Sequence, residues 1–158
     1  MVINLKRLIR RMFREFLVHH YSSLEYRAKI LTLMVSSDGE MNECEKQKIK
    51  EIAFEVYKDD PDRAEVLIDT VVEFHHKIVN NNGLNYEHLI LQVAKETKEV
   101  KRFAQKIDID LLKRLHECID DEDEEERIFQ KRIIEFLQYL KEKYGGGNHA
   151  MVSLYSKW

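Results

Sequence analysis

LTLMVSSDGEMNECEKQKI, residues 31–49, is the stretch that decides the fold. Its first part is an apolar run that ends at Asp38-Gly39, a pair that favours a tight turn. Asn42 is a good N-cap residue, and Glu45 three positions later completes the pattern of a capping box. The segment therefore predicts a helix, a sharp corner and a second helix with a well-defined start.

The composition favours helices along the rest of the chain. The 158 residues include 5 Gly and 1 Pro, and three of the glycines form the run 145–147. So few turn-forming residues do not suit a β-sandwich or barrel, and they exclude the common Gly-rich phosphate loops. We expect an all-α, single-domain bundle of about six to seven helices. The expected helices span about 2–20, 23–35, 42–57, 60–79, 85–106 with a break near Thr97, 108–118, and the acidic run to 144.

Charge and cysteine content narrow the class of protein. The formal net charge is −3, which does not suit a general nucleic-acid binder. Cys44 and Cys118 form no CxxC motif, so we expect two reduced, partly buried thiols in a cytoplasmic protein. The sequence offers no continuous apolar stretch long enough to be a signal peptide or a membrane-spanning helix.

Residues 1–20 are expected to form a basic amphipathic helix. Its apolar residues recur at steps of three and four, and one acid, Glu15, accompanies five bases. The bases are Lys6, Arg7, Arg10, Arg11 and Arg14. Such a helix can lie on an anionic membrane surface, peripheral to the inner membrane, or dock on a protein partner. It can equally pack its apolar stripe on the bundle and leave its arginines in water.

A weak internal repeat relates the two halves of the chain. A shift of 81 residues aligns Glu45 with Glu126, and it also aligns apolar helix positions on either side. The second copy has Ile119-Asp120 where the first has Asp38-Gly39, so the sharp corner is replaced by a longer acidic run.

Residues 31–49 resemble the signature of TerB-like domains. In that family an apolar helix ends in an Asp-Gly corner, and a capped helix follows with a Glu and then Ile or Leu four residues on. The resemblance is closest to the variant in DjlA-type co-chaperones and covers about residues 24–144, of which only the first corner is specific. It implies an all-helical, non-enzymatic domain linked to tellurite and other stress responses, which binds metal through acidic residues. Asp38 and Glu45 match the motif; no His-Pro-Asp triplet occurs, so J-domain activity cannot be carried over.

Two acidic segments are candidate sites for a divalent cation. The first comprises Asp38 and Glu45, because hard cations need several oxygens that a turn can gather. The weaker candidate comprises Asp120, Asp121 and Glu126, within a run of seven acids. Acids at a helix N-terminus also cap free N–H groups and complement the helix dipole, so a structural role remains open for both.

The sequence contains no convincing catalytic set. Glu73 and His76 form one Glu-x-x-His, whereas a di-iron bundle needs two. We therefore expect a non-enzymatic interaction module with a protein partner; a membrane-associated protein acting through its first helix is the alternative. A homodimer is a further option, and nucleic acid is not an expected partner. The expected segments are the basic helix 1–20, the TerB-like domain 21–144, and a flexible or non-native tail 145–158.

Overall fold

The computed structural model describes residues 7–9 and 23–146 of the chain. It contains α2 (Ser23–Val35), α3 (Glu43–Val56), α4 (Pro61–Val79), α5 (Tyr86–Glu99), the 3-10 helix η1 (Lys101–Lys106), α6 (Ile109–His116) and α7 (Glu124–Tyr144). Residues 7–9 are also helical, and no strand occurs in the described ranges. The predicted all-α bundle is confirmed.

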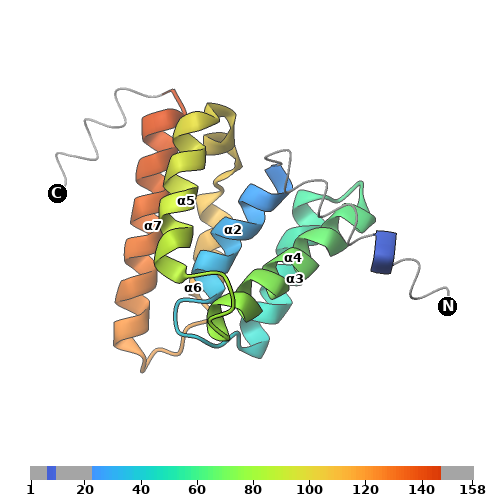
Figure 1. The fold of residues 1–158 in the computed structure, drawn as a ribbon. Helices are drawn as coiled ribbons and strands as arrows, with labels where there is room; N and C mark the ends of the chain where they lie inside the picture. The colour runs from blue at the N-terminus through green and yellow to red at the C-terminus, as the bar shows by residue number, and fades with distance from the viewer. Residues whose placement is uncertain (1–6, 10–22, 147–158) are drawn as a thin grey trace.

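Helix α2 is the centre of the bundle. It packs against α4, α5, α6, α7 and η1, and Figure 1 shows it between the α5–α7 pair and the α3–α4 pair. Nine of its 13 residues are buried, as expected for a helix that is apolar nearly all round. Among the described residues, the buried cluster that it anchors draws its members from residues 24–140.

The predicted helix starts are present. Asn42 and Glu45 form the capping box of α3. Asp60 caps α4 by accepting the N–H of Arg63, and Pro61 is its first helical residue. These signals act between residues three positions apart, which is why the sequence alone could place them.

The helix ends also follow the predicted signals, with one shift. Asn81 has a φ of 52° and Gly83 a φ of 88°, so the run 80–83 ends α4 in left-handed conformations. The break expected near Thr97 falls at Val100 instead. Thr97 stays helical, and its buried hydroxyl bonds both the carbonyl of Val93 at 2.6 Å and the hydroxyl of Tyr26 at 2.5 Å.

Candidate functional site

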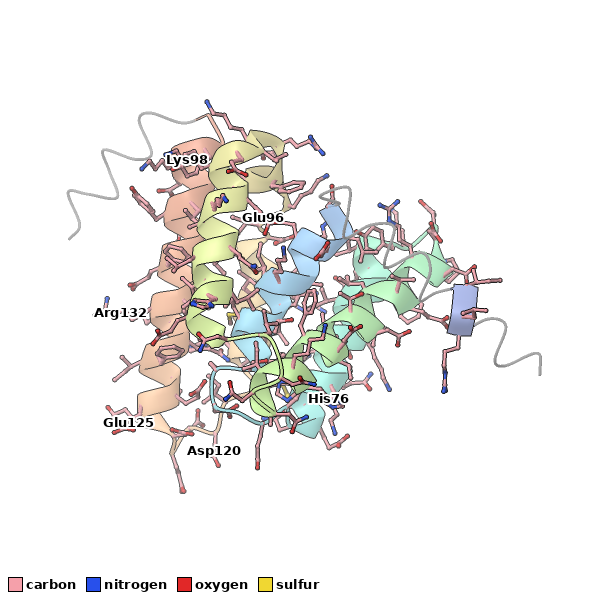
Figure 2. All side chains as sticks on the ribbon, viewed as in Figure 1. His76, Glu96, Lys98, Asp120, Glu125 and Arg132 are labelled. Atoms are coloured by element: carbon pink, nitrogen blue, oxygen red, sulfur yellow. A yellow bond between two sulfur atoms is a disulfide. The ribbon has the colours of Figure 1, made fainter. Side chains whose placement is uncertain are left out.

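Two chain connections meet at one end of the bundle. One joins α2 to α3 (residues 36–42) and the other joins α6 to α7 (residues 117–123); we call them together the double corner. The Nδ2 of Asn42 donates to the carbonyl of Cys118 at 3.3 Å, and the hydroxyl of Ser37 donates to Glu126. Figure 2 shows Asp120 and Glu125 at this end.

A disulfide holds the double corner together, which corrects the expectation of two reduced thiols. Cys44, in the first turn of α3, is bonded to Cys118 after α6, with 5.5 Å between their Cα atoms. No local motif indicates this pairing, because tertiary packing brings the two cysteines together across a separation of 74 residues. Disulfides persist in oxidising compartments and are rare in the cytosol, so the expected cytoplasmic location loses the support of unpaired cysteines.

Glu45 is a buried carboxyl group at the centre of the double corner. Its residue is 3% exposed, and its Oε1 accepts the backbone N–H of its N-cap Asn42 at 3.1 Å. Burial raises the pKa of Glu45 to about 7; the hydrogen bond from Asn42 opposes this rise, and the charges of Asp38 and Glu126 add to it. The carboxyl group of Glu45 therefore keeps its proton to a higher pH than an exposed glutamate does.

Asp38 and Glu126 complete a group of three neighbouring carboxylates. Burial raises the pKa of Glu126, the hydrogen bond from Ser37 lowers it, and the charges of Asp38 and Asp123 raise it further. Asp38 accepts the backbone N–H of Glu40 at 3.1 Å, which stabilises the turn at the corner. The structure thus brings the two residues of the first candidate site to one place and adds Glu126 to them.

The donor set does not fit a metal ion. Among the described residues, no three His, Cys, Asp or Glu side chains lie in an arrangement that could hold one. Two members of the weaker candidate are engaged separately: Asp120 accepts the N–H of Glu122 at 3.1 Å, and Asp121 pairs with Arg127 at 3.5 Å. The contacts support the structural reading of these acids as turn and helix caps.

Three side chains that the sequence analysis did not select hold the C-terminal end of α2. Gln130, 1% exposed, donates to the carbonyl of Met34 at 2.7 Å. Tyr86 donates to the carbonyl of Leu33 at 2.5 Å, and Nδ1 of His75 bonds the hydroxyl of Ser36 at 2.8 Å. Burial lowers the pKa of His75, as do His76 and Lys46, while Asp38 acts in the opposite direction. The sequence could at most have indicated a polar residue at a core position of a helix. It does not identify the group to which that residue hydrogen-bonds.

The other singled-out residues lie on α4 and in the N-terminal segment. Glu73 pairs with Lys77 at 3.3 Å, within α4. Of the five N-terminal bases only Arg7 is described, and it is exposed; Lys6, Arg10, Arg11 and Arg14 lie outside the described residues, as does the tail from 147. None of the helices described has the length and apolarity needed to cross a membrane.

A groove of about 620 Å³ runs between α3 and α4. Its apolar lining includes Met41, Ile49, Ile68, Val72 and Val79. It begins at the double corner, since residues 39–41 also line it. The sequence analysis did not predict it, because a groove depends on how two helices pack.

The chain was compared with known protein families, curated proteins and solved structures. No protein-family model, curated protein or solved structure matches this chain. The resemblance to TerB-like domains therefore rests on residues 31–49.

Proposed function

We propose that residues 21–144 form a non-enzymatic, TerB-like interaction module whose acidic end binds a protein partner. The observation that carries the proposal is the helix–corner–helix unit of α2 and α3. Gly39 has a φ of 84°, a conformation that a side chain would strain, and the capping box directly follows the corner. These are the features on which the resemblance to the family rests.

The chemistry of the acidic end supports a basic partner. Its exposed carboxylates are Asp38, Glu40, Glu43, Glu117 and the six residues of 120–125. Two cations pair with them: Lys46 with Glu43 at 3.2 Å, and Arg127 with Asp121 at 3.5 Å. A surface of one charge sign steers an oppositely charged partner and selects against acidic ones. The disulfide and the buried network behind it give this surface a fixed shape.

Site-specific photo-crosslinking in cells that produce the protein tests this proposal. A photoreactive amino acid at Glu122 should trap a discrete partner, whereas one at Glu87, an exposed acid on α5, should not. Neutralising the surface by Asp120→Asn, Asp121→Asn and Glu124→Gln should abolish the product. The same crosslinking pattern with and without the neutralised surface would refute the proposal.

The alternative function is peripheral membrane binding through residues 1–20. The observation that favours it is the exposure of Leu8 and Ile9, 48% and 57%, within a segment that carries five bases. Bases near an anionic surface contribute about 1 kcal/mol each, enough for reversible attachment. Sedimentation with anionic vesicles should then separate the full chain from a chain lacking residues 1–20, which retains every residue of the described buried cluster. Equal sedimentation of both chains would reject the alternative.

A further inference from the structure

The α3–α4 groove is shaped to receive a helix. Ile49 and Ile68 line its interior, and Val72 and Val79, about one and three turns beyond Ile68 along α4, stay 37% and 47% exposed. An amphipathic helix that lays its apolar face in such a groove is a recurrent mode of protein recognition. The groove therefore suits a helix with a continuous apolar stripe.

Charge decides which kind of helix fits. Glu40 and Glu43 line the groove where it meets the double corner, and the remaining carboxylates of the acidic end lie beyond them. Lys46 and Lys50 line the groove as well, but Lys46 is paired with Glu43. The groove lining itself thus carries two acids and two bases, and the excess negative charge lies beyond its end, at Asp38 and residues 120–125, which favours a helix that carries its own bases.

Residues 1–20 have both required properties. Their apolar residues recur at helical spacing, and their five bases outnumber the single acid Glu15. The described part of this segment, residues 7–9, is helical, with Leu8 and Ile9 exposed. None of these three residues is among those that line the groove in the described chain. The described chain therefore presents an apolar groove and, at residues 7–9, an exposed part of the apolar stripe.

We propose that residues 1–20 of one copy of this chain dock as a helix in the α3–α4 groove of a second copy. Two copies related by a two-fold axis exchange these segments, so each groove and each stripe is used. The bases lie toward the acidic end of the partner copy, and the apolar stripe covers Val72 and Val79. This dimer does not depend on the TerB-like assignment.

Sedimentation velocity of the full chain over a range of concentrations tests the dimer. The unaltered chain should dimerise. A groove variant, Val72→Glu with Val79→Glu, and a segment variant, Leu8→Glu with Ile9→Glu, should each raise the dissociation constant at least tenfold. Leu91→Glu is the matched control, because Leu91 is an apolar residue of α5, 66% exposed and remote from the groove. Circular dichroism should show unchanged helix content in all three.

Mixing the two variants distinguishes exchange from other kinds of dimer. The groove variant retains a sound segment and the segment variant a sound groove, so an equimolar mixture should form a heterodimer through one contact. Its affinity should fall between those of the unaltered chain and the variants alone. A mixture that stays monomeric, or a groove variant that dimerises normally, would overturn the proposal. A monomeric full chain would also overturn it, since a segment folded onto its own groove gives that result.

Discussion

Glu45 and Glu126 occupy the same position, the third residue, of α3 and α7, and they lie close enough at the double corner to interact electrostatically. The N-caps of these helices are Asn42 and Asp123, and the negative charge of Glu126 raises the pKa of Glu45. The two N-caps are related by the same 81-residue shift that aligns the halves of the sequence. Two neighbouring carboxyl groups, Glu45 and Glu126, whose pKa values are both raised, make the stability of this fold sensitive to pH.

Glu45→Gln should remove one source of pH dependence. The pKa of Glu45 is raised from 4.5 to about 7, so the folded state holds the proton more tightly than the unfolded state. The stabilisation is complete below the ordinary pKa and is lost as pH rises toward 7. It amounts to at most about 3 kcal/mol. Urea unfolding of the unaltered chain and of the variant at intervals from pH 4.5 to 8 measures the difference.

His75 requires that this comparison be made between matched chains. Its pKa is lowered, so it stabilises the fold above its ordinary value of 6.5 and loses that contribution as pH falls. Both chains contain His75, and the difference between their curves isolates Glu45. The glutamine oxygen can still accept the N–H of Asn42. A difference that does not change between pH 4.5 and 8 would contradict the assignment.

Reduction of the disulfide should weaken the fold without abolishing it. The bond between Cys44 and Cys118 closes a loop spanning 74 residues, and chain entropy predicts a contribution of about 4 kcal/mol. Neither cysteine belongs to the buried apolar cluster of the described residues, so reduction removes no residue from that cluster. Denaturant unfolding of Cys44→Ser with Cys118→Ser, beside the oxidised chain, should show this loss at unchanged helix content.

Thiol counting provides the control for that prediction. The denatured, unreduced chain should show no free thiol, and each single Cys→Ser variant should show one. Two free thiols in chain purified without reductant would contradict the pairing.

Gln130 should prove to be a structural residue of the double corner. It donates to the carbonyl of Met34, and its Oε1 bonds Nδ1 of His116 at 3.1 Å. Gln130→Met retains the volume but leaves both groups without this partner, at a cost of about 2 kcal/mol. Gln138→Met, on a half-exposed position of the same helix, is the matched control and should cost much less. Equal unfolding free energies for the two variants would show that the buried bonds contribute little.

The local part of this fold could be predicted from the sequence because its signals act over short distances. The corner at Gly39, the capping box at Asn42 and the proline start of α4 each depend on residues within one turn. The apolar spacing of successive helices then required a bundle.

The candidate site could be predicted only in part, because it is made by contacts between distant residues. Asp38 and Glu45 were found through their helix-start pattern, whereas the link from Gln130 to Met34 spans 96 positions. Cys44 and Cys118 share no local motif. Which residues of α6 and α7 face α3 depends on packing that periodicity alone does not specify.

Replacement of Glu45 by glutamine should leave the affinity of the chain for divalent cations nearly unchanged. The buried side chain already accepts a hydrogen bond from Asn42, so ions arriving from solvent meet the exposed carboxylates of residues 120–125 first. Calorimetric titration of the full chain with Ca²⁺, Mg²⁺ and Zn²⁺ should give affinities for Glu45→Gln within about twofold of the unaltered chain. Tight binding that the variant loses would instead make the corner a metal site.

Removing one partner of the buried ion pair between Lys29 and Glu96 should lower the free energy of unfolding strongly. Replacing both partners by apolar residues should lower it much less. Nζ of Lys29 lies 2.6 Å from Oε2 of Glu96, and their side chains are 13% and 8% exposed. Lys29→Met leaves the carboxylate buried without this partner, at a cost of about 3 kcal/mol. The double variant Lys29→Met with Glu96→Leu should recover most of that loss, because no charge of the pair remains buried. Denaturant unfolding of both singles and the double completes the cycle; a double variant as unstable as the sum of the singles would show that the pair is not coupled.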